Sequence, residues 1–181
     1  MLPDVAGRIR RRLRVGGEIR SGQCFCGAIR FRMHGAPMFV HCCHCRDCQR
    51  QSGSAFAVNG LIEAERVELL EGEPVAMRMA TESGYPHDIY RCPTCQSAVW
   101  SDYGGRTWLR FLRLATLDDP GAFAPDVHIY TRSKVAWLAL PEDTPAFDAY
   151  YDVRAQWPAE SQARYKAAKD RAGREAEGSS G

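Results

Sequence analysis

The stretch Cys43–Cys48 reads C-H-C-R-D-C and places three cysteines within six residues. Two further cysteine pairs flank it, C-F-C at Cys24–Cys26 and C-P-T-C at Cys92–Cys95. A C-x-C pair is too close for an unstrained disulfide, and a C-x-x-C pair forms one mainly in redox motifs. Both spacings suit convergence on one metal ion, so the sequence predicts a fold held together by metal clips.

The two flanking pairs predict a closed site. Side chains at positions i and i+2 of an extended segment point to the same face, so Cys24 and Cys26 can reach one ion. Cys92 and Cys95 have the spacing of a knuckle that turns both thiolates toward one point. A tetrahedral zinc takes four such ligands at about 2.3 Å. We therefore expect a structural zinc that crosslinks the start of the domain to its middle.

The central run predicts a second site with an open position. Cys43 and Cys45 share a face, and Cys48 follows Cys45 at knuckle spacing, so three thiolates would hold a second zinc. Three protein ligands plus a free position is the pattern of a reactive zinc. Two alternatives stay open, because either His44 or Cys42 could be a fourth ligand and close the site. The extended geometry points both of these side chains away from the other ligands.

Composition limits the function classes. The chain has 181 residues, 45% of them hydrophobic, and a formal net charge of +2, which is ordinary for a globular domain. So mild a charge does not indicate a nucleic-acid partner. No run approaches the roughly 18 apolar residues of a membrane span. Arginines at positions 8–14, in place of an apolar segment, argue against secretion, so we expect a cytoplasmic protein.

The amino-acid composition divides the chain into three parts. Residues 1–20 are interpreted as a basic leader, 21–150 as one mainly β domain of short antiparallel strands, and 151–181 as a helical and flexible tail. Pro158 suits the first turn of a helix, and the residues after it are rich in Ala, Lys, Arg and Glu.

Two details of the β domain can be checked directly. Residues 67–70 and 75–79 are strand candidates joined by a turn at 71–74, which predicts a β-hairpin. Residues 135–140 are also predicted to be extended.

Four runs together resemble the glutathione-dependent formaldehyde-activating enzymes, a family shared with centromere protein V. They are C-F-C-G-A at Cys24–Ala28, C-H-C-R-D-C-Q-R-Q-S-G-S-A-F at Cys43–Phe56, Y-R-C-P-T-C at Tyr90–Cys95, and H-I-Y-T-R-S-K-V-A-W at His128–Trp137. The resemblance spans roughly residues 21 to 150 and keeps the order of all three cysteine clusters.

The resemblance implies a β-tent fold with two zinc ions. It assigns Cys24, Cys26, Cys92 and Cys95 to the structural zinc, and Cys43, Cys45 and Cys48 to the reactive zinc. One departure concerns Gln96, because the family has glycine after the last cysteine pair, where a left-handed backbone relaxes the knuckle.

The function expected from this resemblance is that of a carbon–sulfur lyase. Its substrate would be a small-molecule thiol or a thiol–aldehyde adduct such as S-hydroxymethylglutathione. His41, His44, His87 and His128 are the candidate proton-transfer groups, and Arg46 and Arg50 could meet substrate carboxylates. The alternative is a non-catalytic, zinc-stabilised binding module that uses the arginines at positions 8–14 as a basic arm. The sequence leaves the oligomeric state open.

Overall fold

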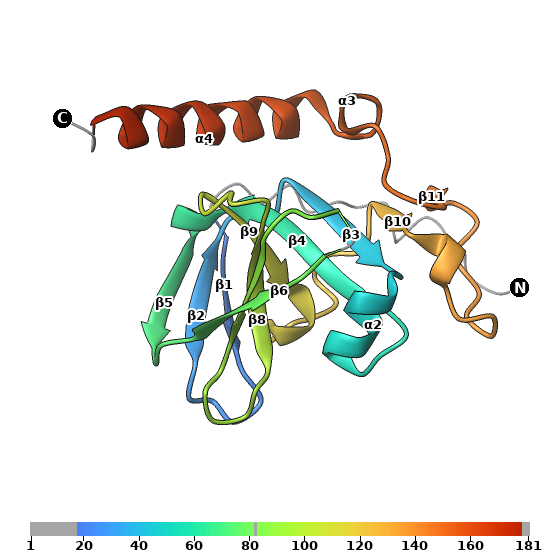
Figure 1. The fold of residues 1–181 in the computed structure, drawn as a ribbon, viewed down its shortest axis with the longest axis horizontal. Helices are drawn as coiled ribbons and strands as arrows, with labels where there is room; N and C mark the ends of the chain where they lie inside the picture. Colours follow the sequence, from blue (N-terminus) through green and yellow to red (C-terminus); the bar gives the residue numbers. More distant parts are fainter. Residues whose placement is uncertain (1–17, 82, 179–181) are drawn as a thin grey trace, which may run out of the picture.

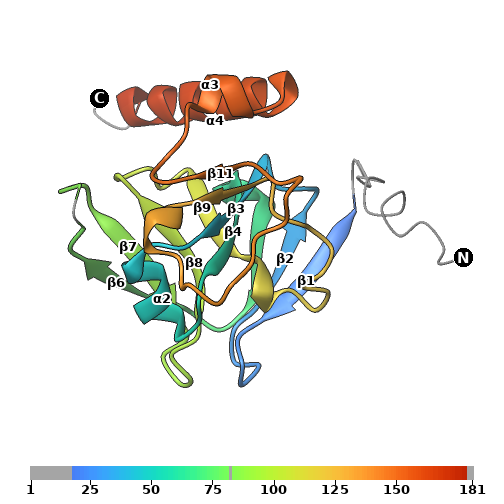
Figure 2. The same ribbon diagram turned by 90° about the vertical axis from the view of Figure 1, so that its right-hand side faces the viewer.

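The computed structural model describes residues 18–81 and 83–178 (Figure 1). The arginine-rich arm lies outside these ranges. The described chain folds into two β-sheets and three α-helices, with a long C-terminal helix lying across one end of the β-structure (Figures 1 and 2). This confirms the prediction of a mainly β protein with a C-terminal helix. None of the described helices is both long and apolar enough to cross a membrane.

The smaller sheet has three antiparallel strands in the order β1-β2-β5. They are β1 (Ile19–Gln23), β2 (Arg30–His34) and β5 (Val67–Glu71). The side chains of strand β2 alternate between its two faces, so that Phe31 and Met33 are fully buried while Arg30 and Arg32 are exposed. Strand β1 begins inside the segment interpreted as the leader.

The larger sheet has eight strands in the order β11-β10-β3-β4-β9-β8-β7-β6. They are β3 (Phe39–Cys43), β4 (Ala57–Glu63), β6 (Val75–Met79), β7 (His87–Arg91), β8 (Ala98–Tyr103), β9 (Leu109–Arg113), β10 (Val127–Ile129) and β11 (Ala146–Phe147). Its pairings are antiparallel, except that β10 runs parallel to both β3 and β11.

The predicted hairpin is wrong, although both of its strands exist. Strand β5 pairs with β2 in the small sheet, whereas β6 pairs with β7 in the large one. The turn between them contains Gly72 in the left-handed conformation, where an added Cβ would meet the carbonyl oxygen of Ala28 at 2.1 Å. The turn thus packs against the loop before β2 and carries the chain from one sheet to the other.

The prediction that residues 135–140 are extended is also wrong, because the structure has turns and irregular backbone there. The last strand, β11, follows this loop and was not predicted.

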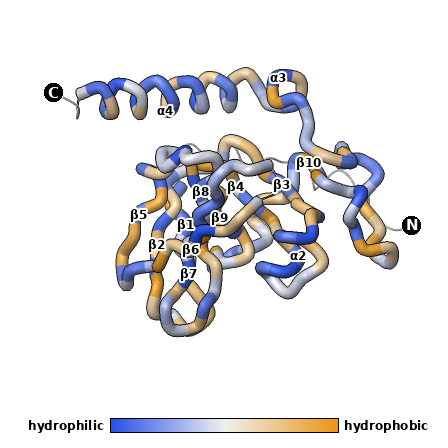
Figure 3. Tube along the Cα trace, viewed as in Figure 1, coloured by the Kyte–Doolittle hydropathy of each residue, from blue (hydrophilic) through white to orange (hydrophobic). Residues whose placement is uncertain are grey.

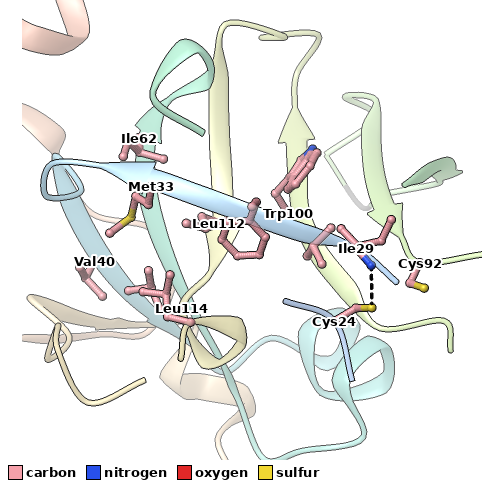
Figure 4. Close-up of a cluster of buried hydrophobic side chains, with 12 residues drawn as sticks. Cys24, Ile29, Met33, Val40, Ile62, Cys92, Trp100, Leu112 and Leu114 are labelled. Atoms are coloured by element: carbon pink, nitrogen blue, oxygen red, sulfur yellow. Dashed lines mark hydrogen bonds between the residues drawn. The ribbon is translucent and has the colours of Figure 1, made fainter. Parts of the chain in front are cut away.

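Two hydrophobic cores lie on opposite faces of the large sheet. The first packs the small sheet against it and includes Phe31, Met33, Ile62, Trp100 and Leu112 (Figure 4). The second lies on the other face and includes Phe39, Leu61, Leu109, Tyr151 and Trp157. Strand β3 is buried along its whole length because its two faces contribute to different cores.

Three α-helices complete the described chain: α2 (Arg46–Ser52), α3 (Val153–Gln156) and α4 (Ala159–Gly178). Helix α4 is largely hydrophilic along its length (Figure 3), as its sequence predicts. It is fixed to the β-structure by the Ser161 hydroxyl, which donates to the carbonyl of Met38 at 2.6 Å, and by the buried Ala168. Arg164 also forms an ion pair with Glu63.

Candidate metal centres

Four cysteines distant in sequence meet at one end of the β-structure. Cys24 and Cys26 follow β1, Cys92 and Cys95 follow β7, and their four sulfur atoms all lie within 4.8 Å of one another. The Cys24 and Cys26 sulfurs are 3.6 Å apart, and those of Cys26 and Cys92 are 3.8 Å apart. A disulfide would require about 2.05 Å. Tetrahedral zinc with Zn–S bonds of about 2.3 Å would separate its sulfurs by about 3.8 Å. The group therefore fits a closed four-thiolate zinc site.

Local turns aim these sulfurs. The backbone N–H of Ile29 donates to the Cys24 sulfur at 3.2 Å (Figure 4), and the N–H of Gln96 donates to the carbonyl of Cys92 at 2.9 Å. Gln96 has a φ of 62°, so it adopts the left-handed conformation that glycine favours after this pair. The departure from the family's glycine thus leaves the turn intact, with a side chain in a region that costs roughly 1 kcal/mol.

Cys43, Cys45 and Cys48 form a separate group whose sulfur atoms also lie within 4.8 Å of one another. Cys43 ends β3, Cys45 caps the start of α2, and Cys48 lies in that helix, with its N–H donating to the Cys45 sulfur at 3.3 Å. The strand-to-helix turn is why C-x-C-x-x-C converges here. Hydrogen bonds from Cys43 and then Cys48 lower the pKa of Cys45 to about 2, whereas the hydrogen bond to Cys45 raises the pKa of Cys43 and the net pKa of Cys48 is raised to about 11. The group therefore shares one negative charge, centred on Cys45, and a bound cation would favour loss of the remaining two protons.

The backbone of this turn is fixed from both sides. The His44 N–H donates to the carbonyl of Ile129 on β10 at 2.9 Å, and its carbonyl accepts from the Gln49 side chain at 2.7 Å. Gln49 also donates to the carbonyl of Ser133 at 2.9 Å. The three-cysteine group is thus held between α2 and the chain around β10.

The two residues considered as a fourth ligand, Cys42 and His44, lie in a third group with His128. The Nε2 of His44 is 3.6 Å from the Cys42 sulfur and 2.9 Å from Nδ1 of His128. Two nitrogens bound to one tetrahedral zinc at about 2.0–2.1 Å would be roughly 3.3 Å apart. The shorter distance is that of an N–H···N hydrogen bond. We interpret this buried group as a histidine pair beside a thiol, joining β3 to β10.

The structure separates the four candidate proton-transfer histidines. His41 is buried and hydrogen-bonded to the Tyr151 hydroxyl, and burial lowers its pKa to about 3. Burial, followed by the charge of His128, lowers the pKa of His44 to about 4, and burial also lowers that of His128. These three are occupied within the fold, whereas the half-buried His87 on β7 packs its ring 5.4 Å from that of Tyr103.

His87 lies near the three-cysteine group. Burial and then the charge of Arg113 lower its pKa, while the charges of Cys45 and Asp47 act in the opposite direction. Within the described part of the chain, the His87 imidazole has a ring contact with Tyr103 but no side-chain hydrogen bond.

The other candidate side chains have different surroundings. Arg46 donates to the Gln49 side chain, and Arg50 is exposed on α2. A residue not identified from the sequence, Arg113 at the end of β9, donates to Gln51 on α2, the helix that carries Cys48. The signal for it in the sequence is weak: one arginine at the end of the strand sequence L-R-F-L-R.

Comparison with known proteins identifies the family of this chain. A protein of Halomonas elongata named "Putative glutathione-dependent formaldehyde-activating enzyme" is 27% identical over 148 residues, covering 76% of this chain and 93% of that protein. A crystal structure of a Rhodobacter sphaeroides protein matches with a TM-score of 0.41 and 16% identity, covering 54% of this chain and 87% of that one, a similarity too low to carry an argument. The family model for the glutathione-dependent formaldehyde-activating enzyme matches residues 19–133, a range that contains all eight cysteines. The chain belongs to the family of glutathione-dependent formaldehyde-activating enzymes.

Proposed function

We propose that this protein forms and cleaves the carbon–sulfur bond of a thiol–aldehyde adduct such as S-hydroxymethylglutathione. Cys43, Cys45 and Cys48 would hold the zinc ion at which this occurs. The observation that carries the proposal is their grouping as three thiols, with Cys42 and His44 in a separate group. A donor set of three leaves a position for a fourth ligand from solution.

The donor chemistry favours a thiol as that fourth ligand. Zinc bound at this site would supply acidity to a substrate thiol and keep it deprotonated near neutral pH. Three thiolates outweigh the charge of Zn²⁺, which makes polarisation of a carbonyl oxygen the weaker contribution. Cys24, Cys26, Cys92 and Cys95 would hold a second, structural zinc. Both sites require reduced thiols, which supports a reducing compartment such as the cytoplasm.

The reaction needs one proton to be moved. In the forming direction, the substrate sulfur bonds to the aldehyde carbon, the C=O π electrons move to oxygen, and that oxygen takes up a proton. In the reverse direction the hydroxyl loses this proton and the C–S bond breaks, with its electron pair returning to sulfur. Within the described chain, His87 is the histidine best placed to hold this proton, since the other three candidates are bonded inside the fold.

Zinc content and adduct exchange together test the proposal. We would count zinc per chain under reducing conditions for the unaltered protein, for Cys45→Ser, and for Cys42→Ser as a neighbouring control. NMR would measure the rate of exchange between free glutathione and its formaldehyde adduct for each. We expect two, one and two zinc ions respectively, with accelerated exchange absent only in Cys45→Ser.

Two results would contradict the proposal. One zinc in both the unaltered protein and Cys45→Ser would mean that the group of three binds no metal. Accelerated exchange that survives Cys45→Ser would place the chemistry elsewhere. The role of His87 has its own readout: His87→Gln should slow exchange while leaving two zinc ions bound.

A further inference from the structure

Arg113 is a buried cation on the sheet face that carries the three-cysteine group. Only 9% of the residue is exposed. Its guanidinium donates through Nη1 to the side-chain oxygen of Asn59 and through Nη2 to that of Gln51 at 3.1 Å. Asn59 is its direct partner across β4 and β9, and Gln51 belongs to α2, the helix that carries Cys48. Arg113 therefore links the sheet to the helix of the site.

Both of these acceptors are neutral amides, so Arg113 has no charged partner there. Among the residues that the structure describes, no carboxylate lies within 4.0 Å of its guanidinium. Two other arginines are instead paired with buried carboxylates. Arg110 on the same strand donates to both oxygens of Asp102 at 2.6 and 2.7 Å, and Arg164 pairs with Glu63 at 2.6 Å. A buried charge without an opposite charge is costly, which makes Arg113 an exception that needs an anion.

The three-cysteine group can supply that anion. Three thiolates on a divalent ion carry a net charge of −1, and Cys43 and Cys48 are buried, with 5% and 8% exposed, so solvent screens this charge poorly. Gln51, which accepts from the Arg113 guanidinium at 3.1 Å, lies three residues after Cys48 on α2, so the two side chains are neighbours on one face of that helix. The guanidinium is thus held on the side of α2 that carries Cys48.

We propose that Arg113 is the counter-charge of the three-thiolate centre and raises its affinity for a divalent metal. Arg113 is a positioning residue in this role, with Asn59 and Gln51 holding its guanidinium in place. The four-cysteine site should not depend on it, because the side-chain hydrogen bonds of Arg113 lead to Asn59 and Gln51 and not to the loops that carry those four cysteines. This inference rests on the metal-binding part of the proposed function.

Metal affinity tests the inference independently of activity. Zinc would be withdrawn from the fully loaded protein by a chelator of known affinity, and release from the two sites would be followed in turn. We compare the unaltered protein with Arg113→Met, which removes the charge, and Arg113→Lys, which keeps it. Arg113→Met should weaken the three-cysteine site by about 10- to 100-fold, as loss of an outer partner of a metal site does. Arg113→Lys should lose clearly less, and the four-cysteine site should be unchanged in both.

Arg110→Met is the matched control, because it removes a paired arginine from the same strand. If it weakens the three-cysteine site as much as Arg113→Met does, general loosening of β9 explains the effect and the inference fails. Equal affinity in Arg113→Met and the unaltered protein also overturns it, while leaving the proposed function intact. Arg113→Lys as weak as Arg113→Met would show that the hydrogen bonds, and not the charge, matter. A single zinc in the unaltered protein would instead refute the proposed function.

Discussion

Replacing Arg164 with alanine should destabilise the protein far more than the same change at Arg171, although both arginines form ion pairs from helix α4. Arg164 makes two parallel hydrogen bonds to the Glu63 carboxylate, at 3.0 and 2.6 Å, and two more to the carbonyl of Ala36 at 3.1 Å. The Glu63 side chain is 6% exposed. Arg171 and Glu65 are 41% and 56% exposed, so water screens their pair.

The expected loss of stability depends on the surroundings of the Glu63 carboxylate once Arg164 is removed. Removing one partner of a buried ion pair costs about 3–5 kcal/mol because the other charge is left unpaired. Glu63 keeps a longer contact with Arg66 at 3.5 Å, which offsets part of this cost. Glu63 can also take up a proton, which limits the cost at pH 7 to about 3.7 kcal/mol for an ordinary glutamate. We expect Arg164→Ala to cost about 2–3 kcal/mol at pH 7, against at most about 1 kcal/mol for Arg171→Ala.

Lowering the pH should reduce the difference in stability between Arg164→Ala and the unaltered protein. In the unaltered protein burial raises the pKa of Glu63, but the hydrogen bond from Arg164 outweighs it and the net pKa is lowered, so the carboxylate stays ionised. Its stabilising effect is therefore complete above the unfolded pKa and is lost as the pH falls through the folded value. In Arg164→Ala, the free energy needed to protonate Glu63 falls with pH and is only about 1 kcal/mol at pH 5 for an ordinary glutamate. The loss of stability caused by Arg164→Ala should therefore decrease toward about 1 kcal/mol at pH 5.

Urea unfolding at fixed free zinc would measure these free energies, because metal binding otherwise shifts apparent stability. The measurement would be made at pH 7 and pH 5 for the unaltered protein and both variants. Penalties for Arg164→Ala and Arg171→Ala that agree within about 0.5 kcal/mol at pH 7 would refute the reasoning. So would a penalty for Arg164→Ala that grows on acidification.

Two further predictions concern left-handed backbone positions. Gln96 has a φ of 62°, so Gln96→Gly should raise the free energy of unfolding by up to about 1 kcal/mol, whereas the β-branched Gln96→Val should lower it. Thermal unfolding with zinc present measures both variants, and equal effects of the two substitutions would contradict the explanation. Gly72→Ala should cost at least about 2 kcal/mol, since backbone strain adds to a Cβ placed 2.1 Å from the carbonyl oxygen of Ala28. The control Gly53→Ala, with a φ of +64° and nothing within 4 Å of its Cβ, should cost only about 1 kcal/mol; if the two alanine variants were equally unstable, the close contact would not be what matters.

The sequence by itself determined which sulfur atoms come together. Cysteines two or three residues apart, such as Cys24 with Cys26 and Cys92 with Cys95, point to a common side in an extended or turning chain. The grouping within each pair therefore depends on local geometry, whereas the meeting of Cys26 with Cys92, 66 residues apart, depends on the fold. The composition of α4 is local in the same sense, and this helix formed as expected.

Only the tertiary structure decided what surrounds those sulfur atoms. The predicted hairpin failed because the close approach of Gly72 to Ala28 sends β5 and β6 into different sheets, and no local signal records that contact. Arg113 is joined to Asn59 because β9 pairs with β4, and to the helix of Cys48 because α2 places Gln51 beside its guanidinium. Such contacts join residues tens of positions apart, and their energies depend on burial and on nearby charges. Spacing along the chain specifies neither quantity.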